Sequence, residues 1–194
     1  MPADGIPPEI EESGVSDWFG SLNDINRTKV KRYLSGIDTT SPVDFIQDLM
    51  SRSSEDHNYK LTVLAGDHAL SLDITPMMQF NVREALIEGL YGSEDYDRAI
   101  EECCANLDLF PEVKEEFMAQ NGGKLPDHIM CRNRLIDILV GVQFQYDKAM
   151  ELLDEFVSIG ILDEEELAYR KQSLKIHRMQ RTFDNIYSYR PKSE

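Results

Sequence analysis

Apolar residues recur at helical spacing along most of this chain. After the start signal Ser16, apolar side chains follow at steps of three to five residues from Trp18 to Leu34, and Gly36 is a typical stop signal. This pattern predicts a first helix over residues 16–36. Ser41 and Pro42, followed by an acid and an apolar run from Phe45, predict the start of a second helix.

The segment 56–73 is compatible with two patterns. Leu61, Leu64 and His68 share a helical face, whereas Tyr59, Leu61 and Val63 alternate as in a strand. We favour a helix, because the sequence offers no second strand to satisfy the backbone of a first. From residue 81 the pattern is helical, with breaks expected at 92–93, 110–111, 121–123, 141 and 160. The predicted fold class is all-α.

Residues 1–15 differ in composition from the rest of the chain. They are rich in proline, glycine and carboxylates and contain few apolar side chains. Such a segment cannot repay the entropy of ordering by burying apolar surface. We therefore predict a disordered acidic tail over 1–15 and a single domain over 16–194.

Two seven-residue blocks fifty positions apart resemble each other. Residues 95–101 read DYDRAIE and residues 145–151 read QYDKAME, and each block follows an apolar helix and a short turn. An ordinary helical hairpin that occurs twice by chance is the alternative. We favour an internal repeat with helix pairs at about 80–111 and 130–161, because both blocks and both preceding turns align.

The paired blocks resemble the tetratricopeptide repeat. That repeat places an aromatic beside the turn, here Tyr96 or Tyr146, and a small residue where two helices cross, here Ala99 or Ala149. Pro111 matches the closing proline of the family, in the first pair only. The resemblance implies a right-handed array of antiparallel helix hairpins, an α-solenoid, with capping helices at both ends.

The C-terminal segment fits the role of a cap. Asp163 and Glu166 form a capping-box pattern that predicts a helix over about 163–189. This would be a long basic helix that covers the last apolar face of the array. The distance between the two blocks exceeds the spacing of the family by the segment Glu112 to Asp127. Within this segment, residues 112–120 are expected to form an extra helix after the break at 110–111.

The resemblance also implies a function. In the family, the first helices of successive repeats line a concave groove that accepts a peptide or an amphipathic helix, and the protein is a non-catalytic interaction scaffold or adaptor. The residues at the corresponding positions here include Asn81, Glu84, Glu88, Tyr91, Arg134 and Ile138. The expected partner is another protein, with Ile138 on the groove floor and lysine or arginine of the partner meeting the two carboxylates.

Charge and cysteine content narrow the class of protein. The formal net charge is −16, which disfavours nucleic acid as a general partner. Three cysteines, no long apolar run and an acidic start without signal-peptide features lead us to expect a cytoplasmic protein without a membrane partner. The sequence does not indicate the oligomeric state.

No motif in the sequence indicates catalysis. Cys103 and Cys104 are adjacent in a predicted helix and point about 100° apart, so they cannot hold one ion together. His128 and Cys131 could share a helical face, but no third ligand stands at a matching spacing. Motifs for nucleotide binding and for known catalytic centres are not present. We expect no enzyme, no metal and no cofactor.

Basic residues gather at the C-terminal end. Residues 170–194 carry a net charge of +5, so the rest of the chain carries −21. This helix either docks on the acidic body of its own chain, which we favour, or forms a basic binding edge of Arg170, Lys171, Lys175, Arg178 and Arg181. The second reading makes the protein a nucleic-acid-associated regulator, the alternative function.

Overall fold

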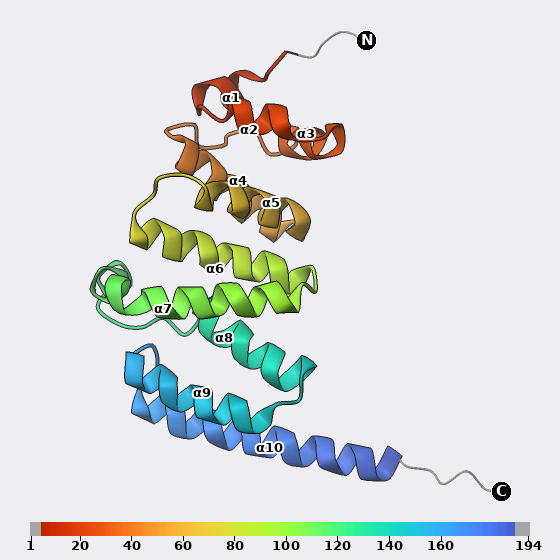
Figure 1. Cartoon of the computed structure of the whole chain (residues 1–194), viewed down its shortest axis with the longest axis vertical. Helices are drawn as coiled ribbons and strands as arrows, with labels where there is room; N and C mark the ends of the chain where they lie inside the picture. Colours follow the sequence, from red (N-terminus) through yellow and green to blue (C-terminus); the bar gives the residue numbers. More distant parts are fainter. Residues whose placement is uncertain (1–4, 189–194) are drawn as a thin grey trace, which may run out of the picture.

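The computed structural model describes residues 5–188, with side chains from 5 to 184, and this part contains helices and no strand. The all-α class is thus confirmed. In Figure 1 the helices follow one another along the long axis in chain order. Their bounds are α1 Pro8–Glu12, α2 Ser16–Ser21, α3 Asp24–Lys31, α4 Pro42–Glu55, α5 Tyr59–Leu70, α6 Pro76–Gly92, α7 Tyr96–Gln120, α8 Met130–Asp137, the π-helical segment η1 Ile138–Val142, α9 Tyr146–Ile159 and α10 Glu164–Ser188.

The N-terminal segment differs from the predicted disordered tail. Residues 1–4 lie outside the described residues, but α1 forms a helical turn whose Ile10 is fully buried. Val15, just after it, is also buried and belongs to the same apolar cluster as Trp18 and Phe19. The prediction is wrong for this part, because two well-spaced apolar residues suffice to dock a short segment on a core that already exists.

We therefore expect Ile10→Ala to destabilise the protein by about 2 kcal/mol, the low end for a buried isoleucine, since a terminal turn can collapse onto the cavity. Ile6→Ala is the matched control, because Ile6 is 43% exposed and should change little. Chemical denaturation of both variants measures the difference. Equal midpoints would show that α1 does not stabilise the core.

The region predicted as one helix over 16–36 is two short helices. α2 ends at Ser21, and Leu22 adopts an extended backbone. The Asn23 side chain then accepts a hydrogen bond from the Asn26 backbone N–H at 2.9 Å and starts α3. Local capping by asparagine thus interrupts an apolar pattern that alone favours continuity.

Two further expectations can be compared with the structure. The ambiguous segment 56–73 contains helix α5, so the preference for helix is confirmed. The break expected at 110–111 is wrong, because α7 runs without interruption through Pro111 to Gln120. Pro111 lies on the exposed side of α7, while Phe110 and Val113 continue its buried face. Burial on one side therefore outweighs the missing N–H of proline on the other.

Three turns between consecutive helices have nearly the same backbone. They join α4 to α5, α6 to α7, and η1 to α9. The residue two before each new helix has a positive φ, which is 56° at His57, 62° at Glu94 and 59° at Phe144. The next residue, the helix N-cap, has φ between −91° and −85° and ψ between 54° and 68° in all three turns.

The same three turns also share side chains. Each new helix begins with a tyrosine and carries a fully buried small residue three positions later; these pairs are Tyr59 and Thr62, Tyr96 and Ala99, and Tyr146 and Ala149. The last two pairs are those that the sequence pattern identified. The first escaped notice because threonine takes the place of alanine and the neighbouring residues differ.

Helix α6 lies between two apolar clusters. Val82, Leu86 and Leu90 belong to the cluster formed with α1–α5, whereas Phe80 and Ile87 belong to the cluster formed with α7–α10. Both of its sides are therefore buried, and its remaining surface faces a cavity described below. The last helix, α10, spans the predicted capping helix, of which residue 189 lies outside the described residues; Asp163 caps it as expected.

Candidate functional site

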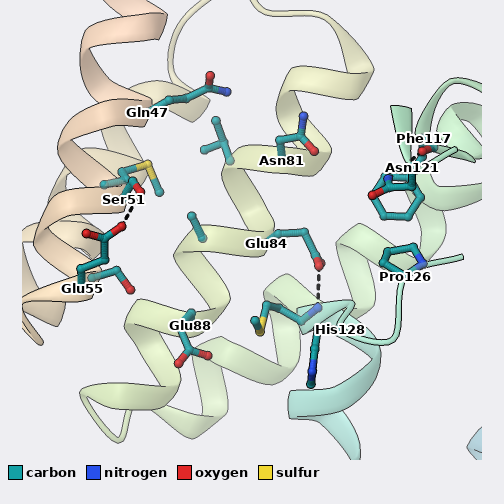
Figure 2. Close-up of a pocket in the computed structure, with 15 residues that line it drawn as sticks. Gln47, Ser51, Glu55, Asn81, Glu84, Glu88, Phe117, Asn121, Pro126 and His128 are labelled. Atoms are coloured by element: carbon teal, nitrogen blue, oxygen red, sulfur yellow. Dashed lines mark hydrogen bonds between the residues drawn. The ribbon is translucent and has the colours of Figure 1, made fainter. Parts of the chain in front are cut away.

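A groove of about 570 Å³ lies between α4, α6 and the loop that leads from α7 to α8. Figure 2 shows α4 along one side, α6 in the middle and the loop on the opposite side. We call this cavity the α6 groove. It is lined by Gln47, Met50, Ser51, Ser54 and Glu55 of α4; Asn81, Val82, Glu84, Ala85 and Glu88 of α6; and Phe117, Asn121, Pro126, His128 and Met130.

The groove combines an apolar floor with a polar rim that includes the exposed carboxylate of Glu55. Met50, Val82 and Phe117 are buried and form the floor. Ser51 and Asn81 are exposed on facing helices and offer a hydroxyl and an amide to a ligand. Concave apolar surface with a few convergent polar groups is the usual composition of a binding site.

Glu84 has a structural task inside the groove. Its carboxylate accepts hydrogen bonds from the backbone N–H groups of Met130 at 2.5 Å and Cys131 at 3.0 Å, which are the first two residues of α8 (Figure 2 shows the first of them). No side chain of α8 itself caps this end. A carboxylate from α6 therefore satisfies the free N–H groups and the dipole of α8.

Asn106 completes this arrangement. Its side chain is fully buried on α7, and its amide N–H group donates to Glu84 at 2.9 Å and to the Phe80 carbonyl at 3.3 Å. Glu84 as a whole is half-buried, but its carboxylate lies beneath the surface. Burial of the carboxylate raises its pKa above the ordinary glutamate value, and the hydrogen bonds that it accepts lower the pKa by less. The oxygen of the Asn106 amide has no hydrogen-bond partner.

Glu88 is also engaged by its own chain. It receives two hydrogen bonds from the Arg134 guanidinium, at 2.7 and 3.0 Å, in a bidentate pair between α6 and α8. The same guanidinium lies 4.3 Å from the centre of the Tyr91 ring. Of these three side chains, only that of Glu88 lines the groove.

The structure places the six predicted groove residues in different surroundings. Asn81, Glu84 and Glu88 line the α6 groove, whereas Tyr91 and Arg134 are not among its lining residues and instead contact each other. Ile138 is fully buried in the first apolar cluster, so its assignment to an open groove floor is wrong. The π-helical segment that contains it places its side chain inside the molecule, which heptad or helical spacing does not reveal.

The predicted basic edge lies mostly against its own chain. Lys171 pairs with Asp154 at 2.5 Å, and Arg178 pairs with Asp147 at 2.6 Å, so both bind the acidic helix α9. Arg170 pairs with Glu166, and Arg181 covers the Phe144 ring. Lys175 is exposed. These contacts favour the expected docking of the basic helix on its own body.

Arg132 was missed by sequence reasoning. Its guanidinium is fully buried and donates to the carbonyls of Ile161 at 2.9 Å and Asp127 at 2.8 Å. Its nearest carboxylate is that of Glu166, at 3.4 Å. Arg132 thereby ties the loop before α8 to the junction of α9 and α10, and it holds one wall of the groove in place from behind.

The cysteines and histidines form no metal site within the described residues, where no group of three or more ligating side chains occurs. Cys103 and Cys131 are buried, and burial raises the pKa of both thiols, so they are not reactive nucleophiles. The groove offers hydrogen bonds and apolar contact.

Comparisons with protein-family models, with curated proteins and with solved structures find no match to this chain. In the part of the chain that the structure describes, no helix combines the length and apolar character that crossing a bilayer requires. The function proposed next therefore rests on the geometry of the groove.

Proposed function

We propose that this protein is a non-catalytic adaptor that binds a segment of another protein in the α6 groove. The observation that carries the proposal is that α4, α6 and the start of α8 line one cavity. These are the first helices of three consecutive helix pairs. The three equivalent turns support a degenerate tetratricopeptide-like array, in which such a surface is the binding surface.

The lining favours one kind of ligand. Both carboxylates on α6 already have partners within the chain, so they are poor acceptors for lysine or arginine of a ligand. The apolar floor and the polar rim suit a peptide that inserts an apolar side chain and is held through its backbone by Asn81 and Ser51, with the exposed Glu55 carboxylate as the acceptor that remains for a basic side chain. This proposal differs from the sequence-based expectation in which Glu84 and Glu88 meet lysine or arginine of the partner.

A peptide-display library tests the proposal. The probe is an unbiased library of 12-residue peptides selected on the immobilised full-length chain. We expect enriched peptides that share an apolar anchor. Ser51→Arg or Asn81→Arg places a long charged side chain at the groove rim, and each should weaken binding of those peptides by about tenfold or more.

Ser158→Arg is the matched control. Like Ser51, Ser158 is an exposed helical serine whose hydroxyl bonds within its own helix, but it lies on α9 and outside the groove. This variant should bind the peptides as the parent does. Equal binding by Ser51→Arg, Asn81→Arg and Ser158→Arg, or no enrichment at all, would overturn the groove assignment.

The alternative of a nucleic-acid regulator is less favoured, because four of the five residues of the basic edge contact side chains of their own chain. Titration of duplex DNA at low salt decides it. Steep weakening with rising salt, lost on Arg178→Ala, would support that alternative over the groove.

A further inference from the structure

The two ends of the α6 groove differ in charge. Along α4 the lining residues run from the amide of Gln47 to the carboxylate of Glu55, and along α6 they run from the amide of Asn81 to the carboxylate of Glu88. In Figure 2 the two amides lie toward one end of the groove and the two carboxylates toward the other. We call these the amide end and the acid end. A ligand in the groove meets uncharged groups at the first and carboxylates at the second.

Glu55 is the lining carboxylate that keeps its charge for a ligand. Glu84 accepts hydrogen bonds from the backbone of α8, and Glu88 is paired with Arg134. Glu55 is exposed and receives one hydrogen bond, from the Ser51 hydroxyl at 3.4 Å. Within the described part of the chain Glu55 forms no ion pair, and the residues that line the groove include no lysine or arginine.

Arg52, the arginine of α4 closest to Glu55 in the sequence, is held elsewhere. Its guanidinium pairs with Asp48 at 2.9 Å and donates to the carbonyls of Ser35 at 2.9 Å and Gly36 at 2.5 Å. These contacts fix the guanidinium on the segment between α3 and α4. The acid end of the groove therefore offers an unpaired carboxylate that favours a cation of the partner.

The spacing along α4 sets the distance between this carboxylate and the apolar floor. Met50 of the floor lies five residues before Glu55, which is about 7.5 Å along the axis at about 1.5 Å per residue. In an extended peptide two residues span about 6.6 Å and place both side chains on the same face. The flexible stem of a lysine or arginine covers the remaining distance.

We infer that the segment bound in the α6 groove carries a lysine or arginine two residues from its apolar anchor and that this residue pairs with Glu55. The inference rests on the proposed function of the groove. Glu55 then fixes how the segment is placed, with the basic residue at the acid end and uncharged residues at the amide end. An acidic residue in the basic position is selected against, because it repels Glu55.

Selection of an unbiased library of 12-residue peptides on the full-length chain and on its charge variants tests the inference. We expect peptides enriched on the parent to carry the basic residue at least threefold more often than the library does. Glu55→Gln should abolish this preference, and Glu55→Lys should replace it with aspartate or glutamate. Glu101→Lys is the matched control, because it makes the same charge change at an exposed helical glutamate outside the groove. Peptides selected on this control should keep the basic residue.

The affinity of one enriched peptide gives a second measurement. Replacing its basic residue with glutamine should weaken binding to the parent by about threefold at low salt, as is usual for an exposed ion pair, and by less as salt rises. The same replacement should leave binding to Glu55→Gln unchanged. Peptides that share an apolar anchor without the basic preference, or the same preference on the parent and on Glu55→Lys, overturn this inference and leave the groove assignment intact. Absence of any enrichment overturns both.

Discussion

Arg132→Ala is expected to lower the free energy of unfolding by about 3–5 kcal/mol. The guanidinium is fully buried, and its removal leaves the Ile161 and Asp127 carbonyls without donors and opens a cavity beneath α8. The cost of the unpaired carbonyls and the cost of the cavity add. The loss of unfolding free energy should therefore be several times larger than the loss on replacing a surface arginine with alanine. Denaturant unfolding followed by circular dichroism measures it.

Two substitutions separate the causes of this loss. Arg132→Lys keeps the charge but cannot reach both carbonyls with one planar group, so it should recover less than half of the stability. Arg170→Ala removes a partly exposed arginine that also contacts Glu166 and should cost about 1 kcal/mol or less. If Arg132→Ala and Arg170→Ala unfold at the same denaturant concentration, the structural role assigned to Arg132 is wrong.

Glu84→Lys is expected to destabilise the protein by about 4 kcal/mol, whether or not a partner binds the groove. The substitution puts a cation against the N-terminus of α8, leaves two backbone N–H groups without their acceptor and removes one of the two acceptors of the Asn106 amide. Glu101→Lys is the control, since Glu101 is exposed on α7. Thermal and denaturant unfolding of both variants should differ clearly, and similar stabilities would contradict the capping role.

The pH dependence of Glu84 gives a second readout. Burial raises its pKa in the folded state above the value in the unfolded chain. In the pH range between these two values the folded protein binds more protons, so this group stabilises the fold as pH falls through that range and loses this contribution as pH rises. Glu84→Gln should remove this part of the pH profile. If the parent and Glu84→Gln show the same slope of unfolding free energy against pH above the ordinary glutamate pKa, the raised pKa assigned to Glu84 is wrong.

The helical class could be predicted because its signal is local. Apolar spacing and start signals such as Ser41 and Pro42 lie within one helix, and the structure contains α4 where they indicate it. The single helix expected over 16–36 is interrupted by a local cap at Asn23, whereas two other errors arose where burial in the folded chain decided the outcome. Ile10 is ordered by a core that the neighbouring sequence does not reveal, and Pro111 is accommodated because its side of α7 faces outward.

The candidate site could be predicted only in part. The family resemblance pointed to Glu84 and Glu88, and both line the groove, but their roles depend on partners 46 residues or more away in α8. Asn106 offered a signal, because it stands where the repeat has a small apolar residue and a buried amide requires a partner. Arg132 gave none, since arginine is ordinarily exposed and nothing in its helix marks it as buried.

The stacking of the helices in chain order has a consequence for folding. Most contacts join elements that are neighbours in the sequence, from α4 with α5 through α7 with α8 to α9 with α10. Each pair closes a short loop, so we expect assembly on the microsecond-to-millisecond scale typical of low contact order. The bond from Glu84 to α8 forms across the whole of α7 and therefore follows the docking of that helix. The α6 groove is thus completed late, after the framework on both sides of α6 has formed.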